Sequence, residues 1–127
     1  MFRKSALALA FVLAATVAAQ AQGIKRTVLQ KTDVPGSSYE SVLGLAEVPA
    51  GLAIGMHTHP GTEQGTLLEG ELILSVDGQP DKTLKPGDSW LIPANTAHDA
   101  KAGSTGAKVI AVYVVEKGKP LASAFKR

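Results

Sequence analysis

Short apolar runs separated by glycine and proline fill the chain beyond residue 22. Turn residues recur at intervals of about 8–12 positions, which is the spacing of short strands in a sandwich or barrel. Residues 22–127 show no sustained 3.6-residue periodicity of the kind that an amphipathic helix produces. The pattern therefore predicts an all-β domain.

The extended runs place the predicted strands at residues 24–31, 39–48, 52–58, 63–68, 72–76, 89–92 and 108–116. Asp77 and Gly78 predict a hairpin with a type I′ turn, since this pair favours positive φ. Residues 69–71 predict a tight turn, and residues 103–106 a loop. The last ten residues are predicted to form either a tail or a segment that packs on a neighbouring subunit.

The first residues have the pattern of a secretory signal peptide. Arg3 and Lys4 precede an uncharged apolar stretch at residues 5–19, and residues 19–21 fit a small-x-small cleavage site. A membrane anchor is the alternative, but about 15 apolar residues fall short of the ~20 that span a bilayer. We expect cleavage after Ala21, export to the periplasm or medium, and one mature domain at residues 22–127.

Removal of residues 1–21 changes the charge balance. The whole chain has 13 basic and 11 acidic residues, and loss of Arg3 and Lys4 leaves 11 of each. No basic field remains to attract nucleic acid or a membrane surface, so neither is an expected partner. The chain has no cysteine, which excludes disulfides, thiolate metal ligands and a cysteine nucleophile.

All three histidines fall in a pattern that suits a metal ion. His57 and His59 are two residues apart, so on a strand both imidazoles point to the same face. Glu63 follows the Pro60–Gly61 bend and can add a carboxylate oxygen, and the fold would have to bring in His98. Three imidazoles and a carboxylate suit Mn, Fe, Co, Ni, Cu or Zn better than Ca or Mg.

A lone histidine is more often a surface or satisfied core residue, and a bare His-x-His is weak by itself. Here no histidine lies outside the pattern. Other candidates are weaker: Asp88 and Asp99 fit turn and surface positions, while Trp90 and Tyr113 fit core packing better than a role in a pocket.

At these residues the sequence resembles the cupin superfamily. The first cupin motif, Gly-x5-His-x-His-x3–4-Glu-x6-Gly, is matched in full by Gly51, His57, His59, Glu63 and Gly70. The second motif, Gly-x5-Pro-x-Gly-x2-His-x3-Asn, is matched at Gly87, Pro93 and His98. Asn95 stands where glycine is usual, which asparagine tolerates because it can adopt positive φ, and Ala102 replaces the final asparagine.

The resemblance implies a cupin jelly-roll barrel of two antiparallel sheets, with a core at about residues 38–116. It also implies that His57, His59, Glu63 and His98 bind one divalent transition metal ion (Fe, Mn, Ni, Cu or Zn). Cupins commonly dimerise through N-terminal strands, which residues 24–31 would supply here.

Three functions remain open at this point. The first is a metal-dependent enzyme, dioxygenase-, isomerase- or lyase-like, that acts on a small oxygenated molecule through open metal positions. The second is a non-catalytic module that binds a small molecule or a metal. The third is a purely structural metal. Fold alone does not choose among them.

Overall fold

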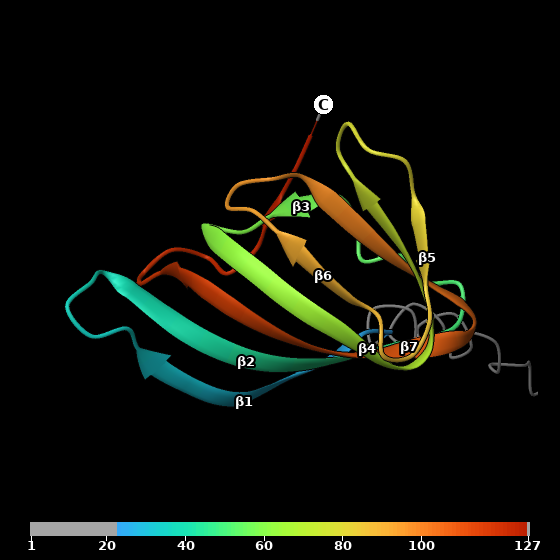
Figure 1. Ribbon diagram of the computed structural model, residues 1–127, viewed down its shortest axis with the longest axis horizontal. Coiled ribbons are helices and arrows are strands. Elements are labelled where there is room, and N and C mark those ends of the chain that lie inside the picture. The colour runs from blue at the N-terminus through green and yellow to red at the C-terminus, as the bar shows by residue number, and fades with distance from the viewer. Residues whose placement is uncertain (1–22, 127) are drawn as a thin grey trace, which may run out of the picture.

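The computed structural model describes residues 23–126, and within them the chain forms eight strands and no helix (Figure 1). The predicted signal peptide lies outside the described residues. The strands are β1 (Lys25–Asp33), β2 (Tyr39–Val48), β3 (His57–Thr58), β4 (Gly61–Val76), β5 (Lys82–Leu84), β6 (Ser89–Ile92), β7 (His98–Glu116) and β8 (Ser123–Ala124). The prediction of an all-β fold is confirmed. It follows that residues 23–126 hold no helix with the length and hydropathy to cross a membrane.

The two longest strands, β4 and β7, pair with each other along most of their length and bend together. Residues 61–69 of β4 pair with residues 108–115 of β7, and residues 72–76 pair with residues 98–102. Between these stretches the register shifts, so that residues 103–106 have no partner in β4. A bulge of this kind bends a strand sharply, and each strand thereby contributes to two layers.

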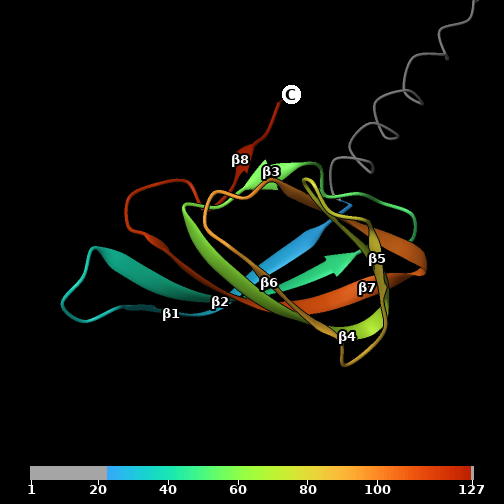
Figure 2. The same ribbon diagram turned by 45° about the horizontal axis from the view of Figure 1, so that its top comes forward.

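The first layer has the order β1-β2-β7-β4-β6, and the second has the order β5-β4-β7-β3-β8. All of these pairings are antiparallel. The layers diverge from the corner where β4 and β7 bend (Figures 1 and 2). This is the two-sheet jelly-roll barrel that the sequence predicts.

The hydrophobic core lies between the two layers. Its buried members come from both and are Val48, Leu67, Leu72, Leu74, Leu84, Ile92, Ala100, Ala102, Ala107 and Val109. Five strands (β2, β4, β5, β6 and β7) contribute to this core, so it holds the two layers together. Some of its members, among them Val48, Leu72 and Leu74, also line a cavity shared with the polar residues of the two motifs.

Some predicted boundaries are wrong, and glycine explains most of them. The run at residues 52–58 was expected to be one strand, but only His57 and Thr58 form β3, with an isolated bridge at Ala53. Gly51 and Gly55 have φ of 72° and 99°, which interrupts an extended chain on both sides of that bridge.

Glycine also explains a wrong prediction at the centre of β4, because a glycine with positive φ can lie in a turn or in a bulge. The predicted tight turn at residues 69–71 does not form, because β4 continues through Gly70 (φ 83°) at the bulge. The predicted loop at residues 103–106 is the facing irregularity inside β7. The turn at Asp77 and Gly78 exists, but only Gly78 has positive φ, which excludes type I′.

The C-terminal residues pack on their own chain. Ser123 and Ala124 of β8 pair with Thr58 and His57 of β3. The described part of this segment is therefore not a free tail, while its packing on a neighbouring subunit stays a prediction.

Gly61 permits the close approach of β4 to β7, and we expect Gly61→Ala to destabilise the fold. An added Cβ would overlap the Val114 carbonyl oxygen and lie 2.6 Å from the Val115 Cα. Backbone atoms cannot move aside as a side chain can, so the expected loss is about 1–3 kcal/mol in urea unfolding.

Gly44→Ala is the matched control, because its Cβ would make only ordinary contacts, with Tyr113 Cε2 at 3.6 Å and Thr27 O at 3.9 Å. This variant should stay within about 0.5 kcal/mol of the wild type. Equal stability of the two variants would contradict the backbone contact at Gly61.

Candidate metal centre

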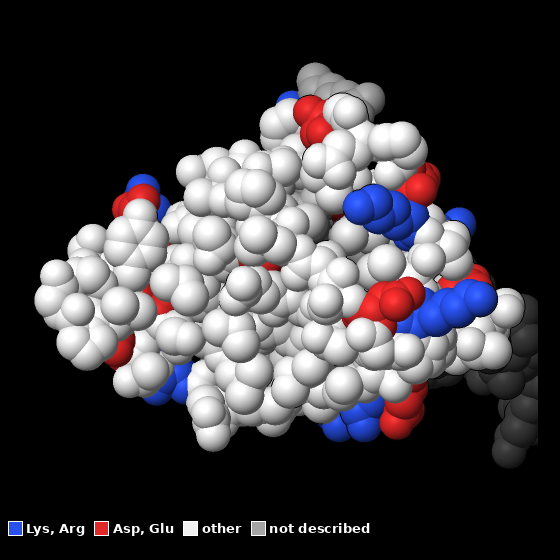
Figure 3. Space-filling model, in the orientation of Figure 1, with Lys and Arg blue, Asp and Glu red and all other residues white. Residues whose placement is uncertain are grey.

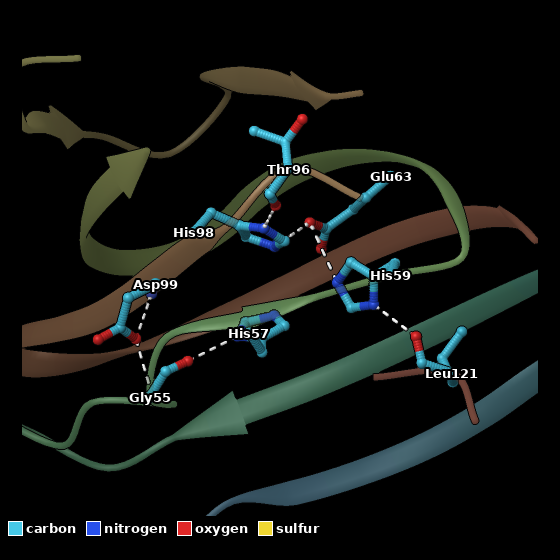
Figure 4. Close-up of polar contacts among 9 residues, drawn as sticks. Gly55, His57, His59, Glu63, Thr96, His98, Asp99 and Leu121 are labelled. Atoms are coloured by element: carbon cyan, nitrogen blue, oxygen red, sulfur yellow. Dashed lines mark hydrogen bonds and ion pairs between the residues drawn. The ribbon is translucent and has the colours of Figure 1, made fainter. Parts of the chain in front are cut away.

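Neighbouring strands bring the four candidate ligands to one place (Figure 4). His57 on β3 pairs directly with His98 at the start of β7. His59 follows β3, and Glu63 lies near the start of β4. Ligand nitrogens of the three histidines lie within 4.8 Å of one another. Glu63 Oε2 lies 3.0 Å from His98 Nε2 and 3.7 Å from His59 Nε2.

Three polar atoms at this centre are buried and have no hydrogen-bond partner among the described residues. They are His59 Nε2, Glu63 Oε2 and His98 Nε2. Their residues are 5%, 7% and 2% exposed. His98 Nε2 and Glu63 Oε2 can pair with each other only when His98 is protonated. With His98 neutral, none of the three atoms meets a donor, which costs about 1–3 kcal/mol for each atom, and a shared ligand would remove this cost.

The second ring nitrogen of each histidine is held by a backbone carbonyl. His57 Nδ1 lies 2.6 Å from Gly55 O, His98 Nδ1 lies 2.9 Å from Thr96 O, and His59 Nδ1 lies 2.7 Å from Leu121 O. A carbonyl only accepts, so each Nδ1 donates its hydrogen. Each Nε2 then keeps a free lone pair, which is the tautomer that a metal ligand needs.

The donor set and its spacing fit a transition metal ion. Adjacent ligands of an octahedral ion with bonds of about 2.1 Å lie about 3 Å apart. The separation of Glu63 and His98 matches this value, and that of His59 and Glu63 exceeds it by less than an ångström. Metal binding by these four residues remains a prediction that the geometry favours.

Asp99 has a role that sequence reasoning missed. It was expected to be a surface or turn residue, yet its Oδ1 accepts hydrogen bonds from Gly55 N at 2.8 Å and Ala100 N at 2.7 Å. Gly55 in turn supplies the carbonyl that orients His57. The one available signal was position, since Asp99 directly follows the histidine of the second motif.

Asn95 behaves as the resemblance predicts. Its φ is 58°, and it is the one non-glycine residue with positive φ between residues 23 and 126. Asn95 N donates to His59 O at 2.9 Å, so the loop of the second motif is fixed against the first motif. Asp88 is a turn residue as expected, with Oδ2 accepting from Lys85 N.

Burial and mutual contact set the protonation of the four residues. Burial lowers the pKa of His57 and of His59, and their carbonyl partners offset only part of this effect. For Glu63, burial pushes the pKa up, but the contact with His98 outweighs it and lowers the pKa overall. For His98, burial lowers the pKa, but Glu63 and the Thr96 carbonyl together raise it. Glu63 is therefore an anion at neutral pH.

A cavity of about 540 Å³ opens onto the four ligands. This volume is typical of sites for small molecules. Its walls are mostly apolar and include Val42, Val48, Ile54, Leu72, Leu74 and Val109. All four candidate ligands line the cavity, so any ion held by them is accessible from it.

Tyr113 lines this cavity, which corrects the expectation of core packing. Its ring centroid lies 4.9 Å from that of His59. Burial, together with the adjacent Glu63 carboxylate, raises the pKa of the Tyr113 phenol far above its ordinary range. The hydroxyl therefore keeps its proton beside the ligands.

Trp90 both packs against the core and lines the cavity, so the two roles considered for it are not exclusive. Gly65 pairs with it across β4 and β6. A Cβ at Gly65 would overlap the indole ring, which shows that Gly65 makes room for Trp90.

The outer face over β4 and β6 is largely uncharged at its centre (Figure 3). Lysine and arginine gather with aspartate and glutamate at its margins, so the two signs are mixed there. The candidate ligands do not belong to this surface, since His59, Glu63 and His98 are buried inside the barrel.

Comparison with models of known protein families shows the family to which this chain belongs. A family model described as a cupin domain matches residues 44–115. The chain belongs to the cupin family. The match spans both motifs, so the resemblance carried by the histidine pattern is confirmed.

Solved structures share this cupin fold. DMSP lyase DddQ from Ruegeria pomeroyi is 21% identical with a TM-score of 0.71, covering 84% of this chain and 54% of that one. KdgF from Halomonas sp. is 23% identical (TM-score 0.64; 76% and 83% covered). The polyketide cyclase RemF from Streptomyces resistomycificus is 23% identical (TM-score 0.64; 84% and 74% covered).

These identities establish the fold and leave the reaction open. The chain spans about half of the DddQ chain that it matches. No protein in a search of curated sequences matches this chain. The function must therefore be argued from the site itself.

Proposed function

We propose that this cupin binds one divalent transition metal ion through His57, His59, Glu63 and His98, and uses it to act on a small oxygenated molecule. One observation carries the proposal: three buried ligand atoms face one another without partners at the end of an apolar cavity. The residues that hold the ion and the residues that would hold the molecule are thus adjacent.

The ligand chemistry narrows the metal to Fe, Mn, Ni, Cu or Zn, since imidazole and carboxylate donors suit these ions. A bound ion of this kind supplies Lewis-acid or oxygen chemistry at its open positions. A purely structural metal is disfavoured, because the cavity reaches all four ligands.

Residues of the cavity would exclude water, select the bound molecule and donate a hydrogen bond to it. The apolar walls exclude water and select a ligand with a compact hydrophobic part. Tyr113 presents a protonated hydroxyl beside Glu63, where it can donate a hydrogen bond to an oxygen of the bound molecule. Dioxygenase-, isomerase- and lyase-like reactions all fit this arrangement, and proteins of similar structure include a lyase, a cyclase and an oxalate oxidase.

Purified protein should contain about one transition metal ion per chain, as expected for a single four-ligand site. We expect His57→Ala/His59→Ala and His98→Ala to lose it in elemental analysis. The folded state alone holds the ion, so adding metal at 100 times Kd should stabilise the wild type by about 2.7 kcal/mol in thermal unfolding.

Leu91→Lys is the control for metal content, because Leu91 is 60% exposed on β6 and does not line the cavity of the four ligands. It should bind metal as the wild type does. Full metal occupancy in His98→Ala would contradict the fourth ligand.

Catalysis is tested separately with the metal-loaded protein and a panel of phenols, diketones and hydroxy acids. We expect metal-dependent turnover, followed by oxygen uptake and by product mass, and a loss of about 10²-fold or more in Tyr113→Phe if its hydroxyl transfers a proton. Saturable binding to the metal-loaded protein without turnover would instead support a non-catalytic binding module.

We also propose that the chain is exported and cleaved after Ala21. The support is the sequence pattern at residues 1–21, where a basic start, an apolar stretch and a small-residue cleavage site follow in order. Export would place the protein in the periplasm or medium.

A homodimer through β1 is a further part of the proposal. β1 pairs with β2 on one side, and all nine of its residues are exposed. Val28 and Leu29 are 63% and 45% exposed on this edge strand. An apolar strand edge is a template for pairing with another strand, and a second copy presents the same edge.

Native mass spectrometry of the exported protein tests both the cleavage after Ala21 and the homodimer through β1. We expect the mass of two chains that each lack residues 1–21. Val28→Lys should shift the protein to monomer, because a charge at the edge opposes strand pairing. Leu91→Lys is the control, since Leu91 is equally apolar and 60% exposed on β6. An uncleaved chain, or a Val28→Lys dimer, would refute the corresponding proposal.

A further inference from the structure

We infer that residues 121–125, here called the strap, are a positioning element of the metal centre that orients His59 and closes one wall of the cavity. This inference rests on the proposed function. It concerns a segment outside both cupin motifs and outside the family match, which ends at residue 115.

The strap returns from the end of β7 to the opening of the barrel. β7 ends at Glu116, and Gly118 with φ 80° turns the chain. Ser123 and Ala124 then pair with β3, and Phe125 N donates to Met56 O at 3.0 Å. Figure 2 shows β8 beside β3 at this end of the molecule.

The strap supplies the hydrogen-bond acceptor for Nδ1 of only one of the three histidines, His59. His57 and His98 each donate to the carbonyl two residues earlier in their own segment, from Gly55 and Thr96. His59 instead donates to Leu121 O, 62 positions away in the chain. Figure 4 shows this carbonyl approaching His59 from the side opposite Glu63.

This asymmetry has a specific consequence. The carbonyls that hold the rings of His57 and His98 belong to Gly55 and Thr96, which are not part of the strap. Without Leu121 O, His59 loses the partner that keeps hydrogen on Nδ1 and leaves the Nε2 lone pair directed at Glu63. The tautomer and ring orientation of His59 alone should then become free.

The strap is also a wall of the cavity, which Leu121, Ala122, Ser123 and Ala124 line. Its residues are all exposed, and the hydrophobic core includes none of them. A two-residue strand with few hydrogen bonds opens at low cost compared with global unfolding. Strap docking and metal binding should therefore stabilise each other.

The first test reads the histidine tautomers by long-range ¹H–¹⁵N NMR of the metal-free protein at alkaline pH. In the wild type all three histidines should carry hydrogen on Nδ1. Phe125→Pro removes the hydrogen-bond donor to Met56, whereas Phe125→Ala keeps it. We expect Phe125→Pro to reduce the Nδ1–H population of His59 only, and Phe125→Ala to leave it unchanged.

The second test measures zinc affinity by competition with a chelator. Loss of a partner that orients a histidine ligand typically weakens metal binding 10–100-fold. A variant without residues 121–127 should weaken zinc binding by about that factor, and Phe125→Pro by up to about tenfold, the equivalent of one hydrogen bond. Circular dichroism and thermal unfolding check that the barrel persists.

Unchanged zinc affinity together with an unchanged His59 tautomer in both variants would overturn the inference. Equal loss of the Nδ1–H tautomer at His57 and His98 would also overturn it, because the effect would then be general unfolding. If the wild type binds no zinc, the proposed metal site fails, while the tautomer measurement still tests the role of the strap.

Discussion

The structure depends on three polar atoms, His59 Nε2, Glu63 Oε2 and His98 Nε2, that are buried without partners of their own. While His98 is neutral, each atom costs about 1–3 kcal/mol, a substantial part of the 5–15 kcal/mol that typically separates folded from unfolded domains. Protonation of His98 would reduce this cost by pairing it with Glu63. The opposing contribution comes from the core between the two layers. The carbonyls at the three Nδ1 atoms reduce the cost by satisfying the other side of each ring, and they also fix the direction in which the unsatisfied atoms point.

The paired bend of β4 and β7 is what allows this arrangement. Because both strands pass from one layer to the other, β4 carries Glu63 in the first layer and pairs with the start of β7 in the second. His98 therefore lies at the end of a long paired strand, and β3 adds His57 directly opposite. The core between the layers continues into the walls of the cavity, where Val48, Leu72 and Leu74 belong to both. Rigid strands position three ligands, while the strap positions only His59.

Much of this could be predicted from the sequence, and the failures have physical causes. Local patterns located β2 and β6, because turn residues act over a few positions. The expectation that His98 joins His57, His59 and Glu63 came from the resemblance to the two cupin motifs, since no local pattern links such distant positions. Glycine with positive φ was ambiguous, since it serves equally in a turn, as at Gly78, and in a bulge, as at Gly70. The roles of Asp99, Tyr113 and Leu121 depend on contacts between segments 44, 50 and 62 positions apart, with Gly55, Glu63 and His59 respectively. A backbone carbonyl such as that of Leu121 leaves no signal in residue type at all.

Chemistry at this site is divided between two sets of residues with different constraints. The candidate ligands would have to satisfy coordination, which restricts residue type and spacing and makes such a set recognisable in the sequence. The walls must only match a molecule in shape, and here that shape results from pairs such as Gly65 with Trp90, where the absence of a side chain on one strand admits an indole from the next. Tyr113 adds one protonated hydroxyl on the ligand side of an otherwise apolar space. Selectivity among oxygenated molecules should therefore follow the walls and the strap, since the same four ligands would polarise any oxygen that reached the ion.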